Sequence, residues 1–286
     1  WKSFFDATLF IDPITVIIGT NASGKSNIFD ALKLLSALAS PIDIMDIAKN
    51  VRGGAEGIIR RGEQMCNLTI TMEGDKSSEQ LIYEVALAFD DQRNIYIKDE
   101  SLILATTKKN LVMFERKELD EMNKSLVRRI KDSTLTVVNN LRKIRLSNPI
   151  PERMRDFAPL SKTIAEDASD LAGYLANLDE ELKSVTYEAI LKYLKPLPDR
   201  DIKSIRADKI PMTDKAMLFC TEEWTTGHTQ EQSALGMSDG TLRFAGIIAM
   251  LITAEDKALI LLEELDKGVH PSRAKDLVKM LKEIGK

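Results

Sequence analysis

Near the start of the chain the apolar positions change from a short continuous run to a helical spacing. Residues 14–18 (ITVII) are all β-branched, are too few for a helix and are followed by Gly19, so we expect a buried strand and then a tight turn. In residues 27–35 the apolar side chains recur at the spacing of an amphipathic helix. The pattern therefore predicts a strand, a glycine turn and a helix in that order.

Three later segments alternate between apolar and polar residues, which is typical of half-buried strands. They are Leu68–Met72, Leu81–Phe89 and Asn94–Leu104, and turn-forming residues separate them at Gly74–Asp75 and Asp90–Asp91. We expect an antiparallel meander packed beside the core that contains the first strand and helix.

From Lys108 the composition shifts towards helix-forming residues. Leu111–Arg145 is rich in Glu, Lys, Arg and Leu, and Asp170–Leu194 is a second block with helical spacing. Short strand-like segments follow at Ile202–Asp208 and Ala216–Glu222. The expected organisation is one composite domain with three parts: an N-terminal half of the core (1–106), an inserted helical lobe (107–198) and a C-terminal half of the core (199–286).

Composition narrows the class of protein. The chain has 286 residues, of which 44% are hydrophobic, and this is enough for a large core. Its formal charge of -4 provides no global basic field for nucleic acid. Solvated helix faces explain local basic runs more often than a polynucleotide contact does. A contact with a polynucleotide backbone stays an alternative for one basic run, which contains Arg128, Arg129, Lys131, Arg142, Lys143 and Arg145.

Cysteine and histidine are too scarce for a structural metal site. Cys66, Cys220, His228 and His270 provide neither a zinc set nor a disulfide framework, so a reducing cytoplasm is the expected compartment. The longest apolar run, near residues 244–254, is well short of the ~20 residues that a membrane span needs, and no signal peptide is visible. We therefore expect a cytoplasmic protein without a membrane partner.

The turn after residues 14–18 carries a phosphate-binding pattern. Gly19–Ser26 fits GxxxxGK followed by Ser or Thr, and it stands between a predicted strand and a predicted helix, as such a loop requires. Its backbone N–H groups can face phosphates, Lys25 can reach the β- and γ-phosphates, and the Ser26 hydroxyl can bind Mg²⁺. An ordinary glycine turn is the alternative, and the flanking elements favour nucleotide binding. The expected nucleotide-binding residues of this loop are Gly19, Asn21, Ala22, Ser23, Gly24, Lys25, Ser26 and Asn27.

A second motif, GMSDGTLR in residues 236–243, precedes the apolar run of residues 244–253. Ser238 stands where a helix would begin, so its hydroxyl, the neighbouring N–H groups and the helix dipole could face an anion. The simpler alternative is that Ser238 and Asp239 only cap the helix.

A third motif follows the apolar run of residues 258–262, which we expect to be a buried strand. Glu263 and Glu264 stand directly after this run, where ligands bind at the carboxyl ends of strands in open α/β sheets. The first acid can hold Mg²⁺ through water, and the second can orient or deprotonate an attacking water. An acidic turn is the alternative, and it fits poorly with two adjacent carboxylates unless a cation is expected there.

Together the glycine loop, the SDG motif and the strand that ends in two acids resemble the ABC-like AAA-type ATPase core related to RecF and SMC proteins. That family includes OLD-type ATPases and many bacterial anti-phage defence ATPases. The resemblance implies an α/β fold: a P-loop NTPase with an ABC-type ATPase head, an antiparallel β subdomain and an inserted helical lobe. It also implies ATP and Mg²⁺ as cofactors.

The resemblance assigns roles to particular residues. Gly19–Ser26 resembles the Walker A loop, and Ser238, Asp239 and Gly240 resemble the signature that completes the ATP site of a partner subunit. Glu263 and Ser26 correspond to the residues that bind the metal. Glu264 corresponds to the catalytic glutamate, and Lys25 is the second residue expected to act in catalysis. Asp266 resembles the D-loop aspartate. Glu263 stands where transporter-type ABC ATPases have Asp. His270 does not match the family's switch histidine, which is expected beyond Lys286.

The implied mechanism is a head-to-tail homodimer, or a higher homo-oligomer, that ATP closes through shared sites. We expect an ATP-hydrolysing protein in anti-phage defence that controls an effector, a nuclease or toxin in the same chain or a separate one. One alternative is a DNA repair or chromosome-maintenance ATPase, for which DNA is the partner, and another is a slow ATP-gated scaffold. The large inserted region and the SDG signature disfavour a transporter subunit.

Overall fold

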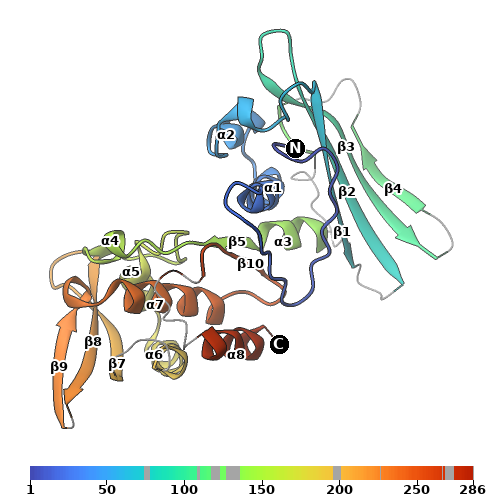
Figure 1. Ribbon diagram of the computed structural model, residues 1–286. Coiled ribbons are helices and arrows are strands. Elements are labelled where there is room, and N and C mark those ends of the chain that lie inside the picture. The colour runs from blue at the N-terminus through green and yellow to red at the C-terminus, as the bar shows by residue number, and fades with distance from the viewer. Residues whose placement is uncertain are drawn as a thin grey trace. The chain divides into compact units, whose positions relative to one another are not determined.

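The computed structural model divides the chain into two compact units. The first unit contains Trp1–Phe10, Val16–Arg145 and Lys257–Leu259, and the second contains Ile11–Thr15, Leu146–Asp256 and Ile260–Lys286 (Figure 1). The structure describes residues 1–73, 78–107, 110–116, 123–126, 136–195, 201–225, 227–265, 267 and 274–285.

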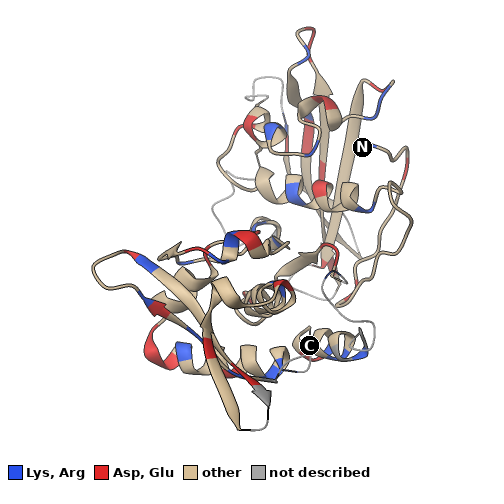
Figure 2. Ribbon diagram, turned by 60° about the vertical axis from the view of Figure 1, so that its left-hand side comes forward, with Lys and Arg blue, Asp and Glu red and all other residues tan. Residues whose placement is uncertain are grey.

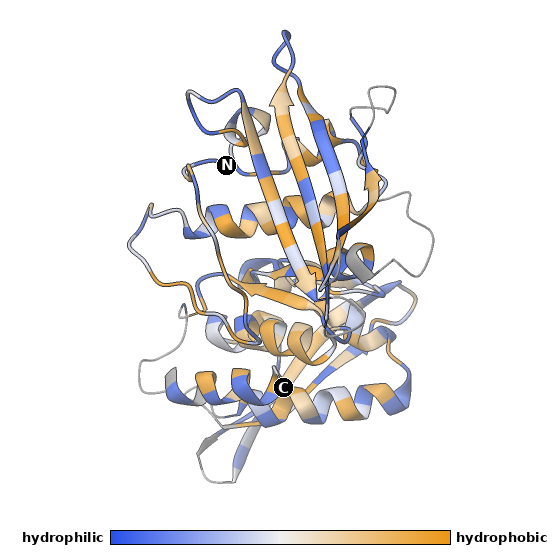
Figure 3. Cartoon of the chain, turned by 90° about the vertical axis from the view of Figure 1, so that its right-hand side faces the viewer, coloured by the Kyte–Doolittle hydropathy of each residue, from blue (hydrophilic) through white to orange (hydrophobic). Residues whose placement is uncertain are grey.

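An antiparallel four-stranded sheet dominates the first unit, with its strands in chain order. Polar and apolar residues alternate along these strands (Figure 3), and the inward side chains of Tyr83, Leu87, Ile97 and Leu102 are fully buried. The three expected strands of the meander are confirmed, and a fourth strand adds to them. The strands are β1 (Met65–Glu73), β2 (Glu79–Phe89), β3 (Ile95–Thr106) and β4 (Asn110–Glu115).

Strand β4 corrects the prediction of helix from Leu111 onwards. Its residues pair with β3, so backbone hydrogen bonds across the sheet override the helical composition. The rest of that block contains α3 (Thr136–Arg142) and β5 (Ile144–Ser147), while Arg128, Arg129 and Lys131 lie outside the described residues. The expected basic strip is therefore described only at its C-terminal end.

Helices α1 (Lys25–Leu38) and α2 (Ile44–Lys49) complete the core of the first unit. Helix α1 buries Leu32, Leu34, Leu35 and Leu38, as its amphipathic spacing predicts, and packs against α2 and α3. Helix α2 packs against β3. The helix predicted for residues 27–35 is thus confirmed, and it begins at Lys25.

A buried acid stabilises the sheet of the first unit. Glu100 on β3 accepts hydrogen bonds from the Tyr83 hydroxyl (2.7 Å), the Ser125 hydroxyl (2.5 Å) and the Leu126 N–H (2.7 Å), and Arg116 Nη2 lies 2.8 Å from its carboxylate. Burial and the adjacent Glu100 raise the pKa of Tyr83 well above its ordinary value, so this phenol stays protonated.

The buried strand predicted for residues 14–18 is not observed. The segment is irregular and all of its side chains except that of Ile17 are exposed, to 74% for Val16 and 90% for Ile18. A β-branched run favours extended backbone, but a strand also needs neighbours for its N–H and C=O groups. No strand in the described part of the chain pairs with this segment.

The second unit packs helices against an antiparallel sheet formed by β6, β7, β8 and β9. The block predicted as helical between Asp170 and Leu194 is confirmed, and it splits at Asp179, which caps the second helix through a hydrogen bond from the Leu182 N–H (2.9 Å). The elements are α4 (Pro151–Met154), β6 (Ala158–Pro159), α5 (Leu171–Asn177), α6 (Glu180–Leu194), β7 (Asp201–Lys209), β8 (Lys215–Thr225), β9 (His228–Ser233), α7 (Asp239–Ile252), β10 (Leu259–Leu262) and α8 (Ala274–Ile284).

Strands β7 and β8 match the two predicted strand-like segments, whereas β9 has no counterpart in the sequence prediction. Its sequence, HTQEQS, has no apolar alternation, and it is a strand because it pairs with β8. Strand β10 pairs with β5. Acidic and basic residues are interspersed along the elements of each unit (Figure 2), in agreement with the formal charge of -4.

Helix α7 is the most apolar helix that the sequence predicts, and ten of its 14 residues are buried in the core of the second unit. Among the described residues, no helix is long and apolar enough to cross a membrane. The two cysteines are both buried and unbridged, Cys66 in the first unit and Cys220 in the second.

Candidate nucleotide-binding site

The glycine loop delivers the chain to the start of α1 without a side-chain cap. Gly24 is the N-cap residue, has φ 95° and ψ 7°, and the first turn of the helix contains no acidic residue. Ala22 also has a positive φ of 65°. The first N–H groups of a helix have no partner within the helix, and here no side chain of the loop satisfies them. This is the geometry in which a helix N-terminus binds an anion.

The side chain of Lys25 closes the loop by binding two of the loop's main-chain carbonyls. Its Nζ donates to the carbonyl oxygens of Gly19 (2.6 Å) and Thr20 (2.7 Å). A Cβ at Gly19 would lie 2.7 Å from Ser23 Oγ, so a larger residue there would force the Ser23 hydroxyl to move. Because Lys25 is only partly buried and holds neutral carbonyls, a phosphate can compete for its ammonium group.

Asn27 has structural partners outside the loop. Its side-chain Nδ2 donates to Ser3 Oγ (2.9 Å), and its carbonyl oxygen accepts from the indole Nε1 of Trp1 (2.6 Å). Asn27 thus contacts the N-terminal segment, and its proposed contact with nucleotide remains a prediction.

Ser238 caps the helix that follows the SDG motif. Its Oγ accepts a hydrogen bond from the Thr241 N–H (3.1 Å) and lies 2.9 Å from Thr241 Oγ1. Asp239, in the first turn of α7, pairs with Arg155 Nη2 at 2.7 Å, and the same nitrogen donates to the Met237 carbonyl (2.9 Å). The capping role considered for Ser238 is therefore present, and it does not exclude a contact with a second subunit.

The two predicted acids stand directly after β10. Glu263 is partly buried, whereas the side chain of Glu264 is 56% exposed and lies 2.5 Å from Lys267 Nζ. Glu264 has φ 51°, which is uncommon for a residue other than glycine, and its carbonyl accepts from the Lys267 N–H (2.9 Å). Asp266 and His270 lie outside the described residues.

Arg243 connects the SDG helix to this acidic turn within the second unit. Its side chain is buried and donates to the carbonyl of Pro149 (2.9 Å), to Asn148 Oδ1 (3.3 Å) and to the carbonyls of Glu263 (3.1 Å) and Glu264 (3.3 Å). The sequence motifs alone predict no role for Arg243. The available signal was a cation at the start of an otherwise apolar helix, which needs buried partners.

The donor atoms predicted for Mg²⁺ are the hydroxyl of Ser26 and the carboxylate of Glu263. Both are hard oxygen donors, which suits Mg²⁺, an ion that keeps several waters and takes few protein ligands. Ser26 belongs to the first unit and Glu263 to the second. Within the described residues no group of three His, Cys, Asp or Glu side chains forms a metal site on its own.

Gly19–Ser26 fits the P-loop pattern and leads into a helix N-terminus without a side-chain cap, although the strand that such a loop requires before it is not observed. The sequence matches the family described as "AAA domain, putative AbiEii toxin, Type IV TA system" over residues 14–286, and the chain belongs to that family. An AAA domain has the α/β fold of P-loop NTPases, so the ATPase class expected from the sequence is confirmed. No curated protein matches the chain.

Proposed function

We propose that the protein binds Mg-ATP through Gly19–Asn27 and hydrolyses it. The observation that carries this proposal is the start of α1, where an αL glycine, the absence of a side-chain cap and an adjacent lysine leave donors for a phosphate. The family supports ATP as the nucleotide.

Each motif then has a separate task. The N–H groups at the start of α1 bind phosphate oxygens, and Lys25 exchanges the carbonyls of Gly19 and Thr20 for the β- and γ-phosphates. Ser26 and Glu263 would hold Mg²⁺, which would neutralise phosphate charge as it develops. Glu264 accepts a proton from the attacking water. The Lys267 ammonium must first move away from the Glu264 carboxylate so that the water can reach it.

The assembly is a head-to-tail homodimer or a higher oligomer in this proposal. Ser238, Asp239 and Gly240 complete the ATP site of a second copy, and Asp266 contacts that copy. We further propose a relation to RecF, SMC and OLD proteins and a three-part organisation in which residues 107–198, which contain β4 as well as helices, are the inserted lobe. The toxin–antitoxin description of the family supports a defence role with an effector, a nuclease or a toxin, as the regulated partner.

The test compares binding, turnover and mass in three proteins: the unchanged chain, Lys25→Ala and Glu264→Gln. We expect Lys25→Ala to lose Mg-ATP binding. Glu264→Gln should bind Mg-ATP but release phosphate at least about 100-fold more slowly, because a general base contributes at least that factor. Light scattering should show an ATP-dependent dimer that Glu264→Gln stabilises. Lys209→Ala and Glu181→Gln, at exposed positions on β7 and α6, are the controls and should behave as the unchanged chain does.

The outcomes separate the alternatives. If the unchanged chain binds no Mg-ATP, or if Lys25→Ala binds it equally well, the nucleotide site is wrong. If ATP is bound and the mass is large but constant while phosphate release is negligible, the slow scaffold replaces the hydrolase. Turnover that rises several-fold with duplex DNA would favour the DNA-maintenance alternative.

A further inference from the structure

A buried ion cluster lies behind the phosphate-binding loop in the first unit. Asp30, in the second turn of α1, is only 4% exposed, and two cations share its carboxylate. Lys2 Nζ lies 2.7 Å from Oδ2, and Arg52 Nε lies 3.1 Å from Oδ1. The Lys2 side chain is itself only 7% exposed. Buried charges are costly unless they are paired, so Asp30 and Lys2 depend on each other, while the Arg52 side chain is 51% exposed and adds a weaker, solvent-screened contact.

The cluster joins three segments of the chain. The Lys2 ammonium also donates to the Arg52 carbonyl (2.7 Å), and the Lys2 N–H donates to the Ile58 carbonyl (2.9 Å). The N-terminal segment, the glycine- and arginine-rich segment of residues 51–62 and α1 therefore meet at Asp30. Lys2 has φ 44°, a conformation that is costly for a residue other than glycine and persists where the surrounding structure enforces it.

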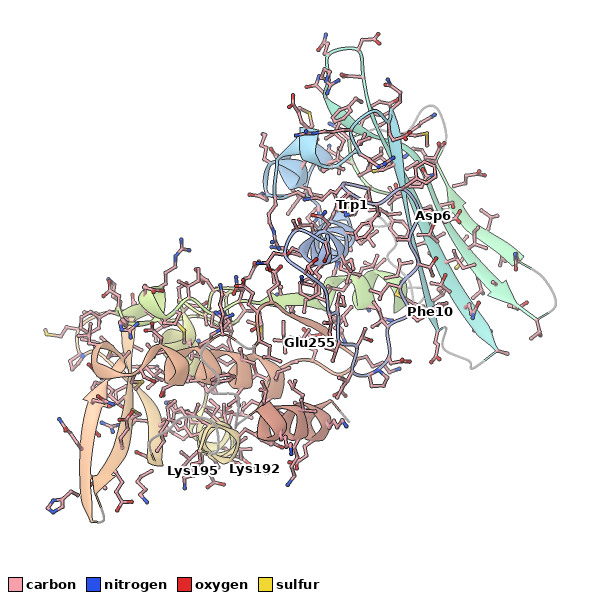
Figure 4. All side chains as sticks on the ribbon, in the orientation of Figure 1. Trp1, Asp6, Phe10, Lys192, Lys195 and Glu255 are labelled. Atoms are coloured by element: carbon pink, nitrogen blue, oxygen red, sulfur yellow. The ribbon has the colours of Figure 1, made fainter. Side chains whose placement is uncertain are left out.

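The segment Trp1–Phe4 packs against one side of the first turns of α1. Figure 4 shows Trp1 beside α1, where its indole donates to the Asn27 carbonyl, while Ser3 Oγ accepts from the Asn27 side chain. At Gly24 a Cβ would lie 2.8 Å from Ser3 Oγ and 3.1 Å from the Phe4 ring. Gly24, Asn27 and Asp30 are spaced by three residues, so one side of the first two turns contacts this segment.

We propose that Asp30 is a positioning residue for the phosphate-binding loop, which acts by holding Trp1–Phe4 against the first two turns of α1. This inference rests on the proposed nucleotide site and goes beyond it, because Asp30 is not a phosphate ligand. Without the carboxylate, Lys2 would be a buried cation without its counter-ion, and the segment would leave α1. Gly24 and Asn27 would then lose their neighbours in Trp1–Phe4, which fix the start of α1 before phosphate arrives, and binding would carry the cost of ordering it.

The test measures two properties in one set of variants. Trp224→Phe leaves Trp1 as the single tryptophan of a chain that has two, so its emission reports whether the segment lies on α1. In this background we compare Asp30→Asn, Lys2→Met and the double variant, and titrate each with Mg-ATP by calorimetry. Glu100→Gln is the matched control, because Glu100 is an equally buried acid of the same unit that is paired with Arg116.

We expect Asp30→Asn to shift the Trp1 emission to the red and to weaken Mg-ATP binding about tenfold, the size typical of removing a group that orients a ligand-binding residue. Lys2→Met should act in the same direction. The double variant should lose no more affinity than Asp30→Asn alone, because the two residues act through one contact. Glu100→Gln should unfold more easily and bind Mg-ATP within about twofold of its background.

Two results would overturn the inference. One is a folded Asp30→Asn protein with unchanged Mg-ATP affinity, and the other is an equal loss of affinity in Glu100→Gln, which would reduce the effect to general stability. If Asp30→Asn does not fold, Lys2→Met decides by the same criteria, because Asp30 keeps Arg52 in that variant. Failure of the proposed function is seen separately, in the absence of Lys25-dependent Mg-ATP binding by the background protein.

Discussion

Helix α1 in the first unit and helix α7 in the second have the same length of 14 residues, and their first turns are built differently. In α7 the Ser238 hydroxyl satisfies the Thr241 N–H, and Asp239 adds a negative charge to the first turn. In α1 the N-cap is Gly24, no side chain caps the helix and the first turn has no acid. Every helix begins with N–H groups that lack partners within it, and in α7 the Ser238 cap satisfies one of them. In α1 the Asn27 N–H donates to the Gly24 carbonyl (2.9 Å), and no side chain caps the N–H groups of Lys25 and Ser26, which can face a phosphate.

The cations of the two helices differ in the same sense. Lys25 and Arg243 both donate to main-chain carbonyls, but Lys25 is partly exposed and holds the two carbonyls of its own loop. Arg243 is buried and holds carbonyls from two other segments. A compact ammonium on a flexible stem can change partners, while a planar guanidinium with several fixed acceptors cannot. Lys25 can therefore exchange its carbonyl partners for a phosphate, whereas Arg243 keeps its own.

The largest expected effect comes from breaking the rigid contact. Arg243→Ala removes donors from the carbonyls of Pro149, Glu263 and Glu264, and we expect the free energy of unfolding to fall by about 3 kcal/mol, since each buried hydrogen bond to a charged group contributes about 1.5–3 kcal/mol. Lys25→Ala should change it by less than about 0.5 kcal/mol, as surface changes do. Urea unfolding followed by circular dichroism measures both values. Equal losses in the two variants would contradict the comparison.

Gly24→Ala tests the start of α1, and we expect it to have the second largest effect. The new Cβ would sit at positive φ and against Ser3 and Phe4, so we expect a loss of about 2 kcal/mol in stability and a weaker Mg-ATP complex. Gly62→Ala is the matched control, because Gly62 has φ 91° with open space around the added methyl group. It should lose only about 1 kcal/mol and keep its Mg-ATP affinity. A larger loss in Gly62→Ala than in Gly24→Ala would show that backbone strain, and not the contact with the N-terminal segment, limits this position.

The elements with a clear hydrophobic periodicity could be predicted from the sequence, whereas elements that depend on pairing with a distant strand could not. Helix α1, the strands β1–β3 and the pair α5 and α6 follow from periodicity, and all of them lie where the sequence places them. Strand β9 did not, because its residues are polar and only its pairing with β8 makes it a strand. The apolar run of residues 14–18 shows the converse, since its composition predicts a strand while no described neighbour pairs with it.

The candidate site divides in the same way. Lys25, Ser26, Glu263 and Glu264 belong to short contiguous motifs and can be recognised without a structure. Asp30 and Arg243 cannot, because their partners lie far away in sequence. Lys2 is 28 positions from Asp30 and Pro149 is 94 positions from Arg243. The acceptors of Arg243 are mostly backbone carbonyls, which leave no mark in the sequence.

Ser238→Ala tests the capped turn of α7, with a smaller effect. We expect a loss of about 1 kcal/mol, the usual value of an N-cap, in the same urea experiment. Ser238→Asn should recover that stability, since asparagine is as good a cap. If Ser238 also contacts ATP of a second subunit, Ser238→Asn will restore stability without restoring phosphate release. Recovery of both by asparagine would limit Ser238 to capping.

The smallest expected effect compares the two units through their single buried thiols. Burial raises the pKa of Cys66 to about 11, and burial together with the adjacent Glu222 raises the pKa of Cys220 to about 12. Both thiols therefore stay protonated at pH 8, and each should react with a maleimide only when its own unit opens.

Between pH 7 and pH 9 the unfolded thiols ionise while the folded ones do not, so the free energy of unfolding falls with rising pH. The loss at pH 9 is about 0.8 kcal/mol for each thiol, and Cys66→Ala or Cys220→Ala should remove its share. Labelling rates of the two single-cysteine variants then rank the opening of the two units, and immediate labelling of Cys220 in the native protein would show that the unit with Arg243 is not the rigid one.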